Sequence, residues 1–226
     1  MKNKVLVLGD GLLGSELVKQ TGWDYVSRKN GDFDIDNMIW YLNKHNVSVI
    51  INCIANTDTY SKDREGHWNV NYSFVNNLID YCNRRDIKLV HISTDYIYAD
   101  SVNNASEEDV PVHCNNWYGY TKLLGDGLVQ LLSNDYLICR CTHKPYPFPY
   151  DGAWIDQIGN FDYVNVISGL IINMVNKNLS GVYNVGTETK TMYELAIQTK
   201  NVERTFTPTH VPKNQSMNIT KLNKNL

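Results

Sequence analysis

Short apolar runs alternate with segments of helical spacing along almost the whole chain, and this alternation constrains the fold more than any other feature. The runs are rich in Val and Ile, and they cover Lys4–Leu8, Val47–Ile51, Ile87–Ile92, Tyr136–Cys139 and Val182–Val185. Each run predicts a strand that is buried on both faces. Helical spacing marks Leu12–Gln20, Asn37–His45, His67–Arg85, Tyr118–Leu132, Tyr163–Asn176 and Thr191–Lys200. Strands that alternate with helices predict right-handed crossovers and an α/β fold with a doubly wound parallel sheet, Rossmann-like in type.

The 226 residues are enough for one domain with a buried core. We therefore expect a single domain over 1–226. Two polar or proline-rich stretches interrupt the alternation, at Asp100–Asn116 and at Thr142–Asn160, and both predict long loops after strands. Residues 142–165 and 187–226 are expected to contribute a small, shortened C-terminal substrate lobe. The Lys- and Asn-rich end from Lys213 is expected to resemble a tail.

Composition argues against several classes of protein. The hydrophobic fraction of 42%, the charged fraction of 20% and the net charge of −3 are ordinary for a soluble globular protein and provide no basic surface for nucleic acid. The five cysteines form no CxxC pair and the six histidines show no ligand spacing, so we expect no metal. The apolar start is too short for a signal peptide, and no apolar stretch is long enough to span a membrane. We therefore expect a cytoplasmic protein with free thiols and no membrane partner.

A glycine-rich turn follows the first predicted strand directly. Its sequence, GDGLLG from Gly9 to Gly14, has the GxGxxG pattern, and a predicted helix begins within it. Glycines at these positions let the turn tighten and let backbone amides approach a pyrophosphate at the positive end of the helix. Because the pattern lies at the first strand-to-helix junction, it indicates a dinucleotide cofactor. The residues expected to hold it are Gly9, Gly11, Leu12, Leu13 and Gly14.

The stretch Tyr25–Lys29, where the second strand of a nicotinamide site usually ends, distinguishes the two nicotinamide cofactors. NAD sites usually carry Asp or Glu here to accept hydrogen bonds from ribose hydroxyls, whereas this chain carries Ser27, Arg28 and Lys29. Two cations and a hydroxyl suit the 2′-phosphate of NADPH and leave no acceptor for the ribose hydroxyls of NADH. NADPH is therefore the expected cofactor, and NADH is the less favoured one. The alternative is that Arg28 and Lys29 are only solvated loop charges.

A Tyr-x-x-x-Lys pattern, Tyr118 to Lys122, opens a predicted helix after a long loop. This spacing places both side chains on one helix face, where an ammonium can favour the phenolate and make Tyr118 a general acid near neutral pH. The pattern alone is weak, because a second copy, Tyr25 to Lys29, lies at a strand end where the side chains do not meet. Thr94 adds support, because it ends an apolar strand where its hydroxyl can hold a substrate carbonyl. The alternative is that Thr94 only terminates the strand and Asp95 caps a turn.

Several stretches together carry a family resemblance over nearly the whole chain. They are Gly9–Leu17, Phe33–Asp36, Ile51–Ala55, Asn71, His91–Tyr96, Tyr118–Lys122 and Gly181–Gly186. They resemble the extended short-chain dehydrogenase/reductase family, and within it the branch of the dTDP-4-dehydrorhamnose reductases. The resemblance implies NADPH-dependent reduction of the keto group of a nucleotide-linked 4-keto-6-deoxy sugar.

The resemblance also implies roles for individual residues. Thr94, Tyr118 and Lys122 would form the catalytic triad, and Tyr118 and Lys122 would also contact the cofactor. Asp34 and Ile35 would lie near the adenine, Asp36 would cap the next helix, and Asn71 would support the site structurally. The residues expected to line the cofactor are Cys53, Ile54 and Ala55. The residues expected to contact the substrate are Thr57, Asp95, Lys144, Tyr146 and Trp154.

The chain departs from this branch in three ways, and these departures keep alternatives open. The glycine turn is GxGxxG where relatives commonly have GxxGxxG, and the chain is shorter than relatives after Arg140. Relatives that also epimerise the sugar often carry a cysteine where this chain has Asp95. A combined epimerase/reductase or an epimerase stays open, with loop candidates at His113, Cys114, Cys141 and His143. A dinucleotide-binding regulatory or scaffold subunit without turnover is the other alternative, and a homodimer is a candidate assembly.

Overall fold

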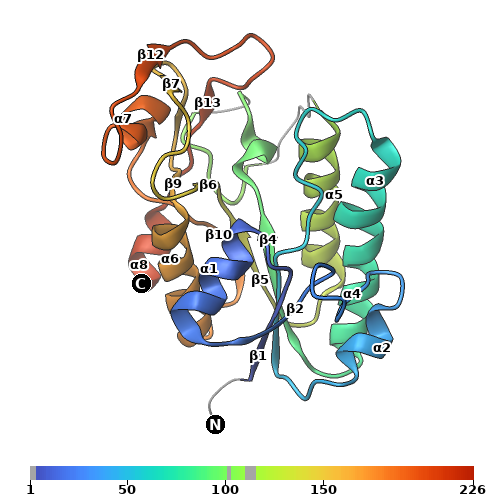
Figure 1. Ribbon diagram of the computed structural model, residues 1–226. Helices are drawn as coiled ribbons and strands as arrows, with labels where there is room; N and C mark the ends of the chain where they lie inside the picture. Colours follow the sequence, from blue (N-terminus) through green and yellow to red (C-terminus); the bar gives the residue numbers. More distant parts are fainter. Residues whose placement is uncertain (1–3, 101–102, 110–115) are drawn as a thin grey trace.

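A six-stranded sheet forms the centre of the computed structural model, which describes residues 4–100, 103–109 and 116–226 (Figure 1). Its strands are β1 (Val5–Leu8), β2 (Asp24–Val26), β3 (Val49–Asn52), β4 (Lys88–Ser93), β5 (Tyr136–Arg140) and β10 (Gly181–Asn184). They lie in the order β2-β1-β3-β4-β5-β10, and every neighbouring pair is parallel. The predicted α/β class with a doubly wound parallel sheet is confirmed.

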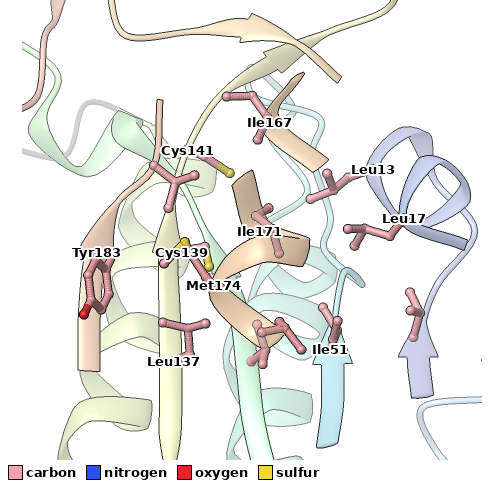
Figure 2. Close-up of a cluster of buried hydrophobic side chains, with 14 of the residues drawn as sticks. Leu13, Leu17, Ile51, Leu137, Cys139, Cys141, Ile167, Ile171, Met174 and Tyr183 are labelled. Carbon is pink, nitrogen blue, oxygen red and sulfur yellow. The ribbon is translucent and has the colours of Figure 1, made fainter. Parts of the chain in front are cut away.

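Helices bury both faces of this sheet, because alternate residues of each strand point to opposite faces. In β1, Val5 and Val7 join one core, while Leu6 and Leu8 join the other. The first core lies under α1 (Leu12–Thr21) and α6 (Val164–Asn176), whose side chains face β3 and β5 in Figure 2. The second core lies under α2 (Met38–Leu42), α4 (Phe74–Asn83) and α5 (Trp117–Leu132). Burial on both faces explains why the strands are unbroken apolar runs in the sequence.

The helix predicted over His67–Arg85 is divided into three pieces. α3 (Arg64–Trp68) continues into a π-helical turn, η1 (Asn69–Ser73), and then into α4. Asp63 caps α3 by accepting a hydrogen bond from the Gly66 amide, so the helix begins before its apolar spacing does. Apolar spacing therefore located this helix but could not reveal its cap or its π-helical turn.

A lobe of short strands lies at the carboxyl edge of the sheet, at the top of Figure 1. Its elements are β6 (His143–Lys144), β7 (Gly152–Trp154), β8 (Ile158–Gly159), β9 (Asp162–Tyr163), β11 (Lys190–Thr191), α7 (Met192–Ala196), β12 (Glu203–Thr205) and β13 (Asn214–Gln215). The strands pair as β11-β8-β13, β12-β7 and β6-β9, so the lobe joins two stretches that are distant in the sequence. A separate cluster that includes Phe148, Phe161 and Leu195 is buried inside it.

The end of the chain packs on the rest of the molecule. β13 pairs in the lobe, and the Asn218 amide then donates to the Ala105 carbonyl over 2.7 Å. α8 (Thr220–Asn225) returns to the main sheet, where Leu222 is completely buried in the first core. The expectation of a tail from Lys213 is therefore wrong, because a few buried anchors hold a segment whose other side chains are polar. Within the described ranges, no helix has both the length and the apolar character needed to cross a membrane.

Candidate active site

The strand order reverses between β1 and β3, because the chain passes from β1 to β2 on one side and then to β3 on the other. In open parallel sheets, ligands bind outside the carboxyl ends of the strands at such a point. The turn after β1 and the loop after β3 lie side by side here, and the Cys53 amide donates to the Leu8 carbonyl over 3.0 Å. The topology therefore brings together the predicted cofactor residues at 9–14 and 53–55.

The turn after β1 requires glycine at two positions. Gly9 has a φ of 95°, in the left-handed region that favours glycine. A methyl group on Gly14 would lie 2.0 Å from the Gly9 carbonyl oxygen, so a larger residue would push α1 away from the turn. Gly11 precedes α1 directly, and among the described residues nothing crowds it and no side chain caps this helix end. The first-turn amides of α1 and the space over Gly11 therefore fit a pyrophosphate.

The side chains around this turn differ in burial. Leu13 is buried in the first core, so only its amide can serve a ligand, whereas Leu12 is exposed. Ile54 packs in part against the second core and lies close to Gly9. Cys53 packs in part against the first core, and burial raises the pKa of its thiol to about 12, so the thiol remains neutral.

The loop after β2 differs from its sequence-based interpretation. Arg28 and Lys29 are exposed, but Ser27 is buried, and its hydroxyl accepts a hydrogen bond from the Asn30 amide. The Asp32 carboxylate folds back and accepts from the Ser27 amide over 2.7 Å. The expectation that this turn offers no carboxylate acceptor is therefore wrong. Position along the strand could not reveal Asp32, because only the fold of the loop returns it to the strand end.

Asp34, rather than Asp36, accepts the side-chain hydrogen bonds just before α2. The Asp34 carboxylate accepts from the Asp36 amide over 3.1 Å and from the Asn37 side chain over 3.5 Å. α2 begins at Met38, and no side chain caps it. The prediction that Asp36 caps this helix is therefore wrong. Ile35 packs in part against the second core beside it.

The Tyr-x-x-x-Lys pair lies at the amino end of α5. Asn116 caps this helix, since its side-chain oxygen accepts from the Gly119 amide over 2.7 Å. Tyr118 is half-buried and Lys122 is buried one turn later. Lys122 Nζ donates to the Ile92 carbonyl over 2.6 Å, near the carboxyl end of β4. Burial lowers the pKa of Lys122 to about 8, while the Asp126 carboxylate raises it in opposition.

Thr94 follows β4 directly and lies beside Tyr118. Its hydroxyl accepts from the Tyr96 amide over 3.2 Å. Burial raises the pKa of the Tyr118 phenol, and Thr94 is close enough to lower it in part. The structure therefore brings Thr94 and Tyr118 together. The expected lowering of the Tyr118 pKa by Lys122 is not found, because burial has the largest effect on this pKa and the group that opposes it is the Thr94 hydroxyl.

Asp95 and Lys144, two of the residues expected to contact substrate, act on each other at this edge. Asp95 is completely buried and accepts hydrogen bonds from the Thr142 and Thr94 hydroxyls. Burial raises the pKa of Asp95 to about 6, while Lys144 lowers it in opposition. Asp95 Oδ2 has no hydrogen-bond partner among the described residues. This free oxygen can accept a hydrogen bond from a ligand when the carboxyl is charged.

The other residues expected to contact substrate are dispersed. Tyr146 is 62% exposed, and its ring packs edge to face on Tyr163 with centroids 5.2 Å apart. Trp154 lies in β7 and packs in part against the buried cluster of the lobe. Thr57 is exposed in the loop after β3. The structure therefore places Asp95 and Lys144 in one group and leaves the aromatic residues on the lobe.

The structure describes two of the four candidates for epimerisation, Cys141 and His143. His113 and Cys114 lie outside the described residues. Cys141 is buried, and its pKa is raised to about 12. Burial lowers the pKa of His143 to about 4, which keeps its imidazole neutral.

A buried ion pair below the site was not predicted. Arg140 donates to both oxygens of Asp126, with Nε–Oδ2 at 3.0 Å and Nη2–Oδ1 at 2.9 Å, and it also donates to the Tyr98 hydroxyl. Asp126 follows Lys122 by one helical turn, as Lys122 follows Tyr118, so spacing along α5 could have indicated it. Arg140 comes from β5, and no local signal connects the two residues.

Asn71 connects the loop after β3 with α5. It lies in the π-helical turn, accepts from the Asn56 amide over 2.8 Å and donates to the Thr121 hydroxyl over 3.1 Å. Thr121 stands directly before Lys122. These contacts agree with the expectation that Asn71 supports the site structurally.

Comparison with known proteins identifies the family. Residues 3–143 match the family described as the RmlD substrate binding domain, and the chain belongs to this family. A solved dTDP-4-dehydrorhamnose reductase from Bacillus anthracis, in complex with NADP, is similar with a TM-score of 0.84 and 25% identity over 100% of this chain and 93% of that chain. A UDP-glucuronic acid 4-epimerase from Bacillus cereus, in complex with NAD, shares the fold at 20% identity, with a TM-score of 0.77 over 98% of this chain and 89% of that chain.

Two curated relatives match part of this chain. The probable low-salt glycan biosynthesis reductase Agl14 of Haloferax volcanii is 29% identical over 137 residues, which cover 59% of this chain and 45% of that protein. The dTDP-4-keto-6-deoxy-D-glucose reductase of Streptomyces niveus is 30% identical over 151 residues, which cover 62% and 52%. The chain thus spans about half the length of the curated relatives it matches. The predicted resemblance to the extended short-chain dehydrogenase/reductases and their dTDP-4-dehydrorhamnose reductase branch is confirmed.

Proposed function

We propose that this chain is an NAD(P)H-dependent oxidoreductase, with NADPH preferred, that reduces the keto group of a nucleotide-linked 4-keto-6-deoxy sugar. The observation that carries the proposal is the position of Thr94 beside Tyr118 at the carboxyl edge of the sheet. Lys122, one turn later on the same helix, is bonded to the Ile92 carbonyl near the end of β4. Membership of the RmlD family supports it, as does similarity to a dTDP-4-keto-6-deoxy-D-glucose reductase and to a dTDP-4-dehydrorhamnose reductase.

The cofactor would supply the hydride when bound. Gly11 and the first-turn amides of α1 would hold its pyrophosphate, since this helix end has no side-chain cap. Lys122 would donate to a ribose hydroxyl. Arg28 and Lys29 favour a 2′-phosphate, whereas Asp32 is a competing acceptor for the ribose hydroxyls. The preference for NADPH therefore rests on two exposed cations outweighing one carboxylate.

Tyr118 would donate the proton to the reduced oxygen. Burial raises its pKa, so the phenol is protonated at neutral pH, as a donor in a reduction must be. Thr94 would hold the carbonyl oxygen beside it. Asp95 and Lys144 would bind polar groups of the sugar or its diphosphate, and the exposed ring of Tyr146 suits stacking on a base.

The test is incubation of the chain with NADPH and a panel of nucleotide-linked 4-keto-6-deoxy sugars that differ in nucleotide and in sugar configuration. Loss of NADPH absorbance that depends on one sugar is the expected result. Tight NADPH binding with no loss of absorbance for any sugar would instead favour a regulatory or scaffold subunit. A change of sugar configuration without loss of absorbance would favour an epimerase.

A further inference from the structure

The loop after β3 and a late loop of the lobe meet through two aromatic side chains. Tyr60 and His210 pack edge to face, with ring centroids 5.0 Å apart. Both residues are exposed, and Tyr60 is 48% exposed. Neither belongs to the site residues described above. This contact joins the cofactor side of the main sheet to the substrate lobe.

Tyr60 also contacts a residue beside Tyr118. Its hydroxyl lies 3.1 Å from the Tyr96 hydroxyl. Tyr96 in turn contacts both residues assigned to the substrate carbonyl, since its amide donates to Thr94 and its ring packs edge to face on Tyr118 at 5.8 Å. A displacement of Tyr96 would therefore move the carbonyl-holding hydroxyl and the proton donor together.

The Tyr60–Tyr96 hydrogen bond limits how Tyr96 can move. A phenol has one donor and two lone pairs, so the pair satisfies one bond internally and leaves one hydroxyl proton available. Burial and the contact with Tyr60 both raise the pKa of Tyr96, so its phenol is protonated at neutral pH. The ring of Tyr96 is held at one end by Tyr60 and along its edge by Tyr118.

We propose that Tyr60 and His210 are positioning residues, which hold Tyr96 against Thr94 and Tyr118 and thereby couple the docking of the lobe to alignment of the proton donor. The role belongs to the same reaction, so it rests on the proposed function. Neither residue touches the reacting atoms. Each acts through the next residue in the series His210, Tyr60, Tyr96 and Tyr118.

Kinetics of two matched variants test this series. Tyr60→Phe keeps the ring against His210 and removes only the hydroxyl bond, so kcat should fall by about 3- to 10-fold. His210→Ala keeps the hydroxyl bond and removes the ring contact, so kcat should fall by about 2- to 10-fold. NADPH affinity and the midpoint of thermal unfolding should not change in either variant, because neither contact belongs to the cofactor turn or to a core.

Combining the two substitutions tests the coupling. If Tyr60 and His210 act through one contact, the double variant should lose less activity than the product of the two single losses. Phe206→Ala is the control, because Phe206 is 72% exposed in the same part of the lobe, and it should keep the parental kcat. Losses that multiply fully, or an equal loss in Phe206→Ala, would overturn the proposal.

A measurement without turnover separates this proposal from the proposed function. In protein labelled on its tyrosine rings, Tyr60→Phe should shift the nuclear magnetic resonance signals of Tyr118, while Tyr150→Phe, at an exposed tyrosine of the lobe, should not. If the parental chain reduces no keto sugar but the Tyr118 signals shift, the proposed reaction fails and the positioning contact stands. Unchanged Tyr118 signals in Tyr60→Phe would overturn the contact itself.

Discussion

The proposed cofactor side and the proposed substrate side of the carboxyl edge are built in different ways. On the cofactor side, the shape of the backbone defines the site: Gly9 and Gly14 allow the turn after β1 to lie against α1, and the loop after β3 completes the wall. On the substrate side, buried and half-buried side chains from separate segments define it: Thr94 and Asp95 come from the end of β4, Tyr118 from α5 and Lys144 from β6. Burial shifts the pKa values of the last three.

This difference predicts how substitutions on each side should act. Changes on the substrate side should alter proton transfer and pH dependence while the fold persists. Changes on the cofactor side should alter the stability of the glycine turn or the affinity for the dinucleotide. The following experiments can break or sharpen this distinction.

Tyr118→Phe should have the largest effect. It removes the hydroxyl of the proposed proton donor and keeps the ring against Tyr96, so turnover should fall by about 10² to 10⁴-fold. Single-turnover reduction of a keto sugar at saturating NADPH measures this directly, while cofactor affinity and unfolding should stay close to parental. Tyr120→Phe, on an exposed tyrosine of the same helix, is the matched control and should react normally. A Tyr118→Phe variant with the parental rate would remove Tyr118 from the chemistry.

Asp95→Asn should change the pH dependence of stability. Burial raises the Asp95 pKa from 3.8 to about 6, so the folded state binds this proton more tightly than the unfolded state does. The resulting stability is fully present below the unfolded pKa and is lost as pH rises through the folded pKa, by up to about 3 kcal/mol. Urea unfolding in mildly acidic and mildly alkaline buffer should show this loss in the parental chain and not in Asp95→Asn.

Asp58→Asn provides the control for that experiment. Asp58 is an exposed carboxyl in the loop after β3. It should leave the pH dependence as it is in the parental chain. Identical pH dependence in the parental chain and in Asp95→Asn would show that the buried carboxyl does not carry this effect.

Gly14→Ala should destabilise the fold, whereas Gly11→Ala should not. The methyl group at Gly14 would meet the Gly9 carbonyl at 2.0 Å, and forcing the two apart should lower the free energy of unfolding by about 1 to 3 kcal/mol. Apart from its chain neighbours, no described residue lies within 4 Å of a methyl group at Gly11, so that variant should unfold normally and lose NADPH affinity only. Urea unfolding combined with calorimetric NADPH titration separates the two effects. Equal stability of both variants would contradict the steric account of this turn.

Arg28→Ala should have the smallest of these effects. Loss of one charge-assisted contact at an exposed position should weaken NADPH binding by about tenfold and leave NADH binding nearly unchanged. Asp32→Asn should act in the opposite sense, weakening NADH relative to NADPH. Titration of both cofactors into both variants measures the balance, and unchanged NADPH affinity in Arg28→Ala would show that these cations are only solvated charges.

Local signals predicted much of the cofactor side and less of the substrate side. Val and Ile runs located the strands, and GxGxxG at the end of the first strand located the turn. Both signals are local, because each is carried by consecutive residues of the sequence. Asp32 escaped prediction because a five-residue loop returns it to Ser27. Asp126 and Arg140 escaped because their hydrogen bonds join a helix to a strand.

The sequence by itself determined the succession of strands and helices along the chain, the glycine turn, and the spacing of Tyr118 and Lys122 on one helix. Each of these features depends only on residues that are close together in the sequence. Only the tertiary structure decided which groups titrate unusually, which acid reaches the end of β2, and how Tyr60 and His210 meet beside Tyr96. Burial and contact between distant segments set those properties, and both exist only after the sheet and the lobe have packed together.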